Sequence, residues 1–133
     1  MSRQQPWRRL LQFGAGIGVA GLLCTVPVAA REALPTPAPV VALADLPAEA
    51  RTVHDAVRSG GPFRFAKDGM AFGNRERLLP PARRGFYREY TVTTPGARDR
   101  GARRLVCGGE RPTLPDTCFY TADHYSTFRR IAP

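Results

Sequence analysis

The chain has 133 residues and a formal net charge of +9 at pH 7, because 20 lysine and arginine residues outnumber 11 acidic ones. A chain of this length holds one small domain and excludes a second sizeable core. The basic balance suits an anionic partner such as RNA or a cell envelope and does not choose between them. Nearly all of the positive charge is arginine, with Lys67 the single lysine. A genome rich in G and C gives the same bias without functional meaning.

The first 30 residues have the pattern of an export signal. Arg3, Arg8 and Arg9 form a basic start, and an uncharged run from Leu10 to Ala30 follows them. We predict a signal peptide at residues 1–30 with the cut after Ala30, and therefore a secreted protein. A retained membrane anchor is the alternative, since the uncharged run is just long enough to span a bilayer. The arginine pair partly resembles a twin-arginine signal, so the export route stays open.

Cleavage leaves residues 31–133, with 17 basic and 11 acidic residues. We expect this part to be a monomer without stable membrane association. Its two cysteines, Cys107 and Cys118, are an even number in an oxidising compartment, which predicts a disulfide between them. In the chain-entropy model, closing so short a loop stabilises the fold by about 2–3 kcal/mol.

Residues 31–43 have three prolines within five positions and no regular apolar period, which predicts a flexible Pro/Ala-rich tether. We expect the folded domain to occupy residues 44–133. Pro47–Ser59 is predicted as a helix, because Pro47 suits a first helical position and Gly60-Gly61 ends the pattern. Its apolar positions recur at helical spacing: Leu46, Ala50, Val53 and Val57. No chemistry is assigned to His54 in this helix.

Turn signals divide the rest of the chain into strands. Three segments are rich in aromatic, β-branched and threonine residues, namely 86–94, 103–106 and 125–131. The apolar stripe of the helix needs a sheet to cover it. The sequence therefore predicts an α+β fold, with one N-terminal helix packed on a twisted antiparallel β-sheet.

Alternation within residues 86–93 separates two faces of a strand. Phe86, Tyr90 and Val92 are predicted to face the helix, and Tyr87, Glu89, Thr91 and Thr93 to line an open polar surface. Thr94-Pro95-Gly96 favours a turn that folds Arg100–Val106 back beside this strand. We therefore expect Glu89 and Arg104 to be neighbours.

Three kinds of charged side chain meet in this arrangement: the Glu89 carboxylate, the Arg100 and Arg104 guanidiniums, and the His124 imidazole. Cleaving a phosphodiester beside a hydroxyl, without a metal or cofactor, needs a base, cations for the phosphoryl oxygens and an acid for the departing oxygen. A lone histidine is more often an ordinary surface or core residue. The combination, rather than any one residue, indicates RNA cleavage.

Short motifs recur in a fixed order between Asp45 and Ile131: Leu46-Pro47, Asp68-Gly69, Phe72, Asn74-Arg75-Glu76, Leu79-Pro80, Glu89-Tyr90-Thr91-Val92, Thr94-Pro95-Gly96-Ala97-Arg98, Arg100-Gly101, Arg103-Arg104, Cys107-Gly108, Asp123-His124-Tyr125 and Phe128. Their order and spacing resemble the microbial guanyl-specific ribonucleases. The resemblance is greatest to the secreted streptomycete Sa type, with barnase-like enzymes as more distant relatives.

The resemblance implies that Glu89 is the general base and His124 the general acid. Arg100 and Arg104 fall on the phosphate-binding arginines, and Tyr125 on the tyrosine that helps to hold the phosphate. It also implies cleavage of single-stranded RNA after guanosine through a 2′,3′-cyclic phosphate, which is hydrolysed more slowly to a 3′-phosphate. Neither a metal nor a cofactor takes part.

The resemblance further places Asn74-Arg75-Glu76 on a guanine-binding loop supported by Phe72. Glu76 is expected to accept hydrogen bonds from the N1 and N2 edge of the base, and Arg75 to lie over its ring. Gly73 and Phe65 stand where relatives usually have a larger polar residue and a tyrosine. These two departures predict a looser guanine pocket.

Two other functions stay open: a catalytically inactive RNA-binding module, and a secreted basic interaction protein. Retention of both Glu89 and His124 speaks against the former, because affinity alone needs neither a base nor an acid. The basic site also suits a small acidic inhibitor of the barstar kind, by analogy with the family.

Overall fold

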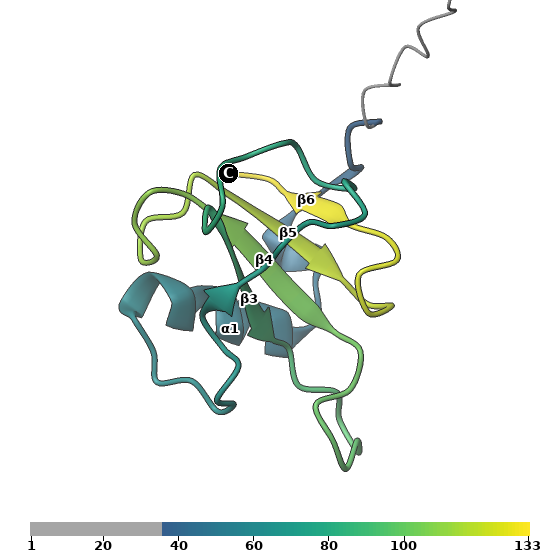
Figure 1. Cartoon of the computed structure of the whole chain (residues 1–133). Helices are drawn as coiled ribbons and strands as arrows, with labels where there is room; N and C mark the ends of the chain where they lie inside the picture. The colour runs from purple at the N-terminus through teal and green to yellow at the C-terminus, as the bar shows by residue number, and fades with distance from the viewer. Residues whose placement is uncertain (1–35) are drawn as a thin grey trace, which may run out of the picture. The chain divides into compact units, whose positions relative to one another are not determined.

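The computed structural model describes residues 36–133, which form one α-helix and a single six-stranded sheet (Figure 1). The elements in chain order are β1 (Val40–Val41), the 3₁₀ helix η1 (Leu43–Asp45), α1 (Ala48–Ser59), β2 (Met70–Ala71), β3 (Tyr87–Thr91), β4 (Arg104–Gly108), β5 (Thr117–Thr121) and β6 (Arg129–Ile131). The strand order is β1-β6-β5-β4-β3-β2, and only the β1–β6 pair is parallel. The predicted α+β fold is confirmed, with a mixed, mostly antiparallel sheet.

The helix predicted at Pro47–Ser59 is present, and it begins one residue later, at Ala48. Pro47 is the residue before its first turn, and the helix ends at Ser59 because Gly60 adopts a left-handed conformation with φ 78°. The amide of Gly61 then donates to the carbonyl of Ala56 at 2.8 Å, which gives this carbonyl in the last turn of the helix a hydrogen-bond partner. Within residues 36–133, no helix is long and apolar enough to cross a membrane.

Two apolar clusters form on opposite faces of the sheet. The first lies between α1 and the sheet: Leu46, Ala50, Val57, Tyr90, Val92, Leu105, Cys107, Cys118, Tyr120 and Ile131. The second is smaller and lies on the other face: Leu79, Tyr87, Val106, Phe119 and Phe128. Strand alternation separates the two sets, so residues on either side of Tyr90 are directed to the face that α1 leaves uncovered.

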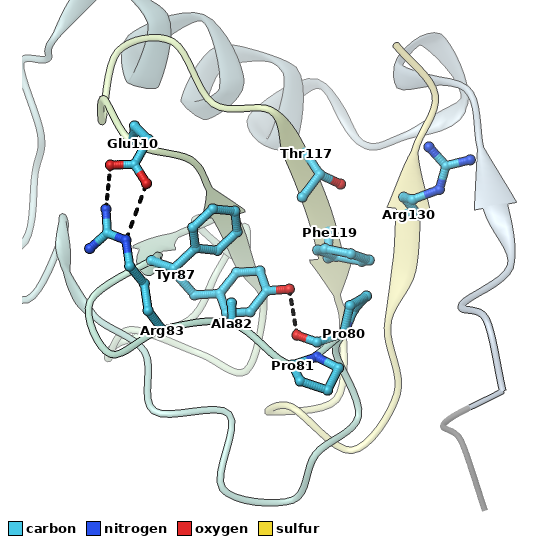
Figure 2. A pocket seen from close by; sticks show the side chains of 10 residues that line it. Pro80, Pro81, Ala82, Arg83, Tyr87, Glu110, Thr117, Phe119 and Arg130 are labelled. Atoms are coloured by element: carbon cyan, nitrogen blue, oxygen red, sulfur yellow. Dashed lines mark hydrogen bonds and ion pairs between the residues drawn. The ribbon is translucent and has the colours of Figure 1, made fainter.

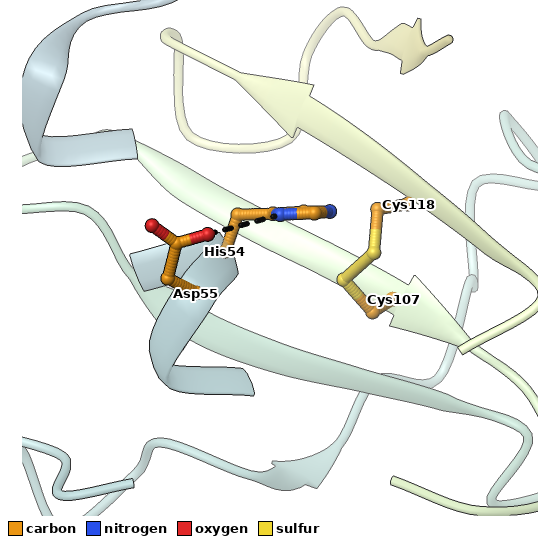
Figure 3. The surroundings of a disulfide bond; sticks show 4 residues. All are labelled: His54, Asp55, Cys107 and Cys118. Carbon is orange, nitrogen blue, oxygen red and sulfur yellow. Dashed lines mark ion pairs between the residues drawn. A yellow bond between two sulfur atoms is a disulfide. The ribbon is translucent and has the colours of Figure 1, made fainter. Parts of the chain in front are cut away.

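The predicted disulfide between Cys107 and Cys118 is confirmed. The two residues are directly opposite in the β4–β5 pair, with Cα atoms 4.1 Å apart and an S–S distance of 2.06 Å. The bond lies on the helix side of the sheet, next to the His54 ring (Figure 3). It therefore joins the two central strands at the end opposite to the loop that carries His124.

The predicted tether is wrong at its C-terminal end. Val40 and Val41 pair with Arg130 and Ile131, and the amide of Arg130 donates to the carbonyl of Pro39 at 2.8 Å. Pairing with a partner strand distant in the sequence holds these residues, although they have little local pattern of their own. The predicted signal peptide and residues 31–35 of the tether lie outside the described residues.

Two strand predictions differ from the structure. β5 (Thr117–Thr121) is a central strand that we did not predict, and it is held by β4 and β6 on its two sides. The predicted strand at 125–131 is extended only in its last three residues. Tyr125 has φ 71°, which strand geometry excludes, so the first part of that segment is a loop.

Two aromatic residues differ from the expectation for this strand. Tyr87 lies on the predicted face but is buried rather than solvent-facing, because the chain after Leu79 folds over it and its hydroxyl donates to the Pro80 carbonyl at 2.8 Å. Phe86 packs against the second cluster instead of the helix. The strand begins only at Tyr87, so its alternation does not extend back to Phe86.

Candidate active site

A row of three buried polar residues crosses the sheet on the face away from α1. Thr91, Arg104 and Thr121 are opposite one another in β3, β4 and β5, and each is at most 3% exposed. Glu89 lies two residues along β3 from Thr91, on the same face, and is opposite Val106. Glu89 and Arg104 are therefore diagonal neighbours, as expected.

The carboxylate of Glu89 is held by two donors from other parts of the chain. The hydroxyl of Tyr125 donates to its Oε2, and Nη2 of Arg100 lies 3.4 Å from its Oε1. Burial, followed by the neighbouring Glu89 carboxylate, raises the pKa of Tyr125 above its ordinary value of 10.0. The phenol thus stays protonated at neutral pH and donates toward this site.

Arg100 reaches the sheet from the loop between β3 and β4. Its Nε and Nη2 donate to the Thr91 hydroxyl at 3.0 and 2.9 Å, in addition to the contact with Glu89. Its side chain is only about a quarter exposed. One face of Arg100 is therefore fixed against β3 before any ligand binds.

Arg104 is buried without a carboxylate partner. The residue is only 2% exposed. Its Nη1 donates to the carbonyls of Arg100, Gly101 and Arg103 at 3.3, 2.9 and 2.7 Å. Its Nε is buried and has no hydrogen-bond partner. No ion pair to Arg104 exists within residues 36–133. A buried and uncompensated cation is costly, and an anion at this position would offset that cost.

His124 is exposed on a tight loop after β5. The residue has φ 56° and Tyr125 has φ 71°, two left-handed conformations that are unfavourable for residues other than glycine. The amide of His124 donates to the Ala102 carbonyl at 3.0 Å, which ties the loop to the Arg100–Arg104 segment. Its ring centroid lies 5.1 Å from that of Tyr125. Tyr125 thus contacts both the imidazole and the Glu89 carboxylate.

Asp123 organises this loop and was not predicted to have a role of its own. Its Oδ1 accepts from the Thr121 hydroxyl at 2.9 Å, and its two oxygens accept from the amide and hydroxyl of Thr127 at 2.9 and 2.6 Å. The hydrogen bonds from Thr127 are the main reason that the pKa of Asp123 lies below its ordinary value of 3.8. The Asp-x-x-x-Thr spacing was the signal in the sequence that indicates such a loop.

A second acidic residue, Asp68, fixes the end of β3. Its Oδ1 accepts from the amide of Thr91 at 2.7 Å, and its Oδ2 from the amide of Phe65 at 3.1 Å. The Phe65 ring, held in this way, lies 6.0 Å from the Arg100 guanidinium carbon. The sequence alone assigns Asp68 no role of its own.

The segment 72–79 forms a closed loop beside the site. Asn74 has φ 45°, and its side chain both donates to the Leu79 carbonyl at 2.9 Å and accepts from the Leu79 amide at 3.1 Å. Its amide group therefore shapes the loop. Arg75 and Glu76 are exposed at the tip. A Cβ at Gly73 would lie 3.6 Å from Cγ of Arg75, so that side chain folds back over the Gly73 backbone.

Phe72 connects this loop to Tyr125 and Phe128. Its ring centroid lies 5.1 Å from that of Tyr125 and 6.0 Å from that of Phe128. The predicted catalytic residues are thus brought together on one face of the sheet, and the predicted base-binding loop borders them through Phe72. Within residues 36–133, no three histidine, cysteine or acidic side chains come together as a metal site.

The arrangement brings two arginines and a tyrosine hydroxyl close to the two residues predicted to transfer protons, Glu89 and His124. Arg100, Arg104 and the Tyr125 hydroxyl offer donors of the kind that phosphate oxygens accept. Glu89 supplies a carboxylate on the sheet, and His124 an exposed imidazole on the adjoining loop. This chemistry suits acid–base displacement at phosphorus.

Comparison with known proteins gives concordant results. A family model described as ribonuclease matches residues 31–132. Guanyl-specific ribonuclease St from Saccharopolyspora erythraea is 50% identical over 91 residues, which cover 67% of this chain and 83% of the relative. Guanyl-specific ribonuclease Sa from Kitasatospora aureofaciens is 48% identical over 91 residues, covering 68% of this chain and 91% of the relative. Ribonuclease Sa3 from the same organism is 48% identical over 86 residues, and the match spans only 58% of its length.

Solved structures agree with the sequence matches. The crystal structure of ribonuclease Sa2 with guanosine-2′-cyclophosphate has 38% sequence identity and a TM-score of 0.66, covering 73% of this chain and 98% of that one. A structure of ribonuclease Sa2 with mononucleotides has a TM-score of 0.68 at the same identity, covering 74% and 97%. The chain therefore belongs to the microbial ribonuclease family, in the group of the Sa-type enzymes.

Proposed function

We propose that the protein is an endoribonuclease that cleaves single-stranded RNA on the 3′ side of guanosine. The observation that carries this proposal is the buried, unpaired guanidinium of Arg104, diagonal to Glu89 on the same sheet face. An RNA phosphate provides the missing negative charge and places the ribose hydroxyl near the carboxylate. Membership of the ribonuclease family supports the same activity.

In the first step, Glu89 removes the proton of the 2′-hydroxyl, and the 2′-oxygen attacks phosphorus. Arg100, Arg104 and Tyr125 stabilise the charge on the phosphoryl oxygens. The bond to the 5′-oxygen of the next nucleotide breaks, and protonated His124 gives that oxygen a proton. The products are a 2′,3′-cyclic phosphate and a free 5′-hydroxyl. Each proton-transfer partner is worth about 10² to 10⁴ in rate.

The second step reverses the two roles. Neutral His124 takes a proton from water, the resulting hydroxide attacks the cyclic phosphate, and protonated Glu89 returns a proton to the 2′-oxygen. The product is a guanosine 3′-phosphate end, and this step is the slower one. Neither a metal nor a cofactor has a part in this scheme.

Guanine is assigned to the loop at residues 72–79. The exposed Glu76 carboxylate suits the N1 and N2 donors of guanine, and Arg75 lies beside Gly73 at the same tip. Asn74 acts by shaping the loop through Leu79. We expect the preference for guanine to be less strict than the requirement for a 2′-hydroxyl, since Gly73 leaves the loop without a side chain at that position.

We propose that residues 1–30 direct secretion and are removed, and that the mature domain is a monomer that an acidic protein inhibitor of the barstar kind can block. The charge pattern of residues 1–30 supports secretion, and the excess of basic over acidic residues in 31–133 supports an acidic inhibitor. N-terminal sequencing of protein from the culture medium of an expressing strain tests the cut. A first residue of Arg31 is expected, and an intact Met1 in the membrane fraction would favour the retained anchor.

The test of the activity is direct. The purified domain is incubated, in EDTA, with a short RNA that contains one guanosine. We expect a 2′,3′-cyclic phosphate at that guanosine, followed by the 3′-phosphate. Binding without products would indicate an inactive RNA-binding module, and neither binding nor products would leave a basic interaction protein.

A further inference from the structure

A pocket of about 560 Å³ opens on the face of the sheet that carries Glu89. It lies at the end of β3 where Tyr87 begins the strand (Figure 2). Its floor is aromatic, formed by Phe86, Tyr87 and Phe119, and Pro80 and Pro81 form one wall. The volume is in the range of pockets that hold small organic groups. None of the residues assigned to catalysis or to guanine lines it.

Two sets of hydrogen bonds hold the pocket in shape before any ligand binds. The Tyr87 hydroxyl donates to the Pro80 carbonyl at 2.8 Å, which fixes the wall to the floor. At the rim, Nε and Nη2 of Arg83 donate to the two carboxylate oxygens of Glu110 at 3.1 and 2.5 Å (Figure 2). A preformed cavity loses little conformational entropy when a ligand enters.

A series of ring contacts runs from the catalytic loop to this pocket. Successive centroids are 5.0 to 6.4 Å apart in the pairs His124–Tyr125, Tyr125–Phe72, Phe72–Phe128, Phe128–Phe119, Phe119–Tyr87 and Tyr87–Phe86. These packed rings, of which Phe128, Phe119 and Tyr87 are buried, place the pocket on the same face of the sheet as the catalytic loop.

The loop assigned to guanine lies between the phosphate site and the pocket. Phe72, where this loop begins, donates its amide to the Tyr87 carbonyl at 2.9 Å, at the pocket end of β3. A smaller hollow of about 190 Å³ includes Leu78 and shares Pro80, Phe119 and Arg130 with the large pocket. The two hollows thus adjoin at Pro80, Phe119 and Arg130, and together they form a groove that begins at Leu78, near the end of the loop.

The charge of the groove favours a polyanion. Arg83 is compensated by Glu110, whereas Arg130 forms no ion pair with any residue from 36 to 133. Arg130 lines both hollows, so this residue lies where they join. Aromatic rings with a neighbouring arginine are the usual combination for binding a base and its phosphate in single-stranded nucleic acids.

We propose that this pocket binds the base of the nucleotide on the 5′ side of the guanosine, with Arg130 beside the linking phosphate. The inference rests on the proposed RNA cleavage. The direction follows from the order of sites: the departing nucleoside lies on the His124 side, and the pocket lies beyond the guanine loop. The base stacks on Phe86, the half-buried ring of the floor.

The test compares three substrates with the wild-type domain: GpA, ApGpA, and an ApGpA analogue in which the first nucleotide lacks its base. We expect kcat/KM to be roughly 5- to 150-fold higher for ApGpA than for the abasic analogue, the contribution of one stacked base. The difference should be in KM, because the contact is remote from the reacting atoms. Equal values for these two substrates would overturn the proposal. Failure to cleave any of the three would overturn the proposed function instead.

Two variants locate the effect. Phe86→Leu keeps an apolar side chain and removes the ring. The ratio of kcat/KM for ApGpA to kcat/KM for the abasic analogue should therefore fall toward one. Arg130→Gln should lower the ratio of kcat/KM for the abasic analogue to kcat/KM for GpA. Arg129→Gln is the matched control, because its guanidinium lies 5.2 Å from the Tyr120 ring, a residue of the helix-side cluster. Thermal unfolding confirms that each variant is folded. Unchanged ratios in both Phe86→Leu and Arg130→Gln would place the base elsewhere.

Discussion

The hydroxyl of Tyr125 donates a hydrogen bond to Oε2 of Glu89, joining the loop after β5 to the middle of β3. The same tyrosine ring lies 5.1 Å from the ring of His124. One side chain therefore sets the position of the carboxylate with respect to the imidazole. It also lies 6.0 Å from the guanidinium carbon of Arg104, so it borders the site that we propose for phosphate.

Tyr125→Phe should lower kcat/KM on GpA by about 10- to 150-fold. A hydrogen bond to a charged group is worth about 1.5–3 kcal/mol, and the substitution removes this one while it keeps the ring packed on Phe72. Steady-state kinetics measures the loss. Tyr120→Phe, in the helix-side cluster, is the matched control and should be close to wild type. A Tyr125→Phe enzyme with unchanged kcat/KM would show that the hydroxyl has no part in the reaction.

Arg104→Met should abolish stabilisation by phosphate. Ligand binding stabilises the native state by about 2.7 kcal/mol at a ligand concentration of 100 times Kd. In the wild-type protein, phosphate at the buried Arg104 should therefore raise Tm, and the variant should show no such rise. The variant should also be inactive. A phosphate-dependent rise in Tm in Arg104→Met as large as in the wild type would place the anion site elsewhere.

Asp123→Asn should remove a pH-dependent part of the stability. The hydrogen bonds from Thr127 lower the pKa of Asp123 in the folded state below its ordinary 3.8, so the ionised form favours folding. This contribution is present above pH 3.8 and is lost as the pH falls through the folded-state pKa. Urea unfolding should thus show the largest difference between wild type and variant near neutral pH, and a smaller one in strong acid. A difference that does not change with pH would contradict this role.

The wild-type protein should lose stability in mild acid because of His54, and His54→Leu should not show this loss. Burial, followed by the charge of Arg58, lowers the pKa of His54 below its ordinary 6.5, while Asp55 acts in the opposite direction. The ring lies against the Cys107–Cys118 disulfide, and its Nδ1 lies 3.9 Å from Oδ1 of Asp55, which forms an ion pair with it only when the ring is protonated (Figure 3). Below pH 6.5 the unfolded chain gains a proton that the folded chain resists, so stability falls until the folded-state pKa is reached.

The measurement for His54 is Tm as a function of pH between 7.5 and 4.5. The wild-type Tm should decrease more steeply below pH 6.5 than that of His54→Leu. His124→Leu is the control, because His124 is exposed and its removal should leave the slope in place. Parallel curves for wild type and His54→Leu would show that burial of this histidine is not coupled to folding.

The sequence predicts those parts of the fold that local patterns determine. The limits of α1 follow from Pro47, the apolar spacing and Gly60, which act within a few residues of the helix itself. The polar face of β3 follows from simple alternation. β1 is different, because Val40 and Val41 are ordered by pairing with β6. No local sequence pattern predicts this contact. β5 was missed for the same reason, since its neighbours on both sides determine it.

The active site divides in a similar way. The residue types and their order indicated Glu89, Arg104 and His124. The burial of Arg104 could not be predicted, because it depends on three carbonyls in the preceding loop. The role of Asp123 also depends on the hydrogen bonds of its side chain. From the sequence alone, this segment indicates only a turn.

The most direct test of the acid–base mechanism is the turnover of Glu89→Gln on GpA, measured beside the wild type and the control Glu49→Gln. Glutamine keeps the shape of the side chain and an oxygen for the Tyr125 hydroxyl, but it cannot take the proton of the 2′-hydroxyl. We predict a folded protein whose kcat is lower by roughly 10² to 10⁴, with Glu49→Gln unchanged. A Glu89→Gln enzyme that turns over at nearly the wild-type rate would contradict the mechanism.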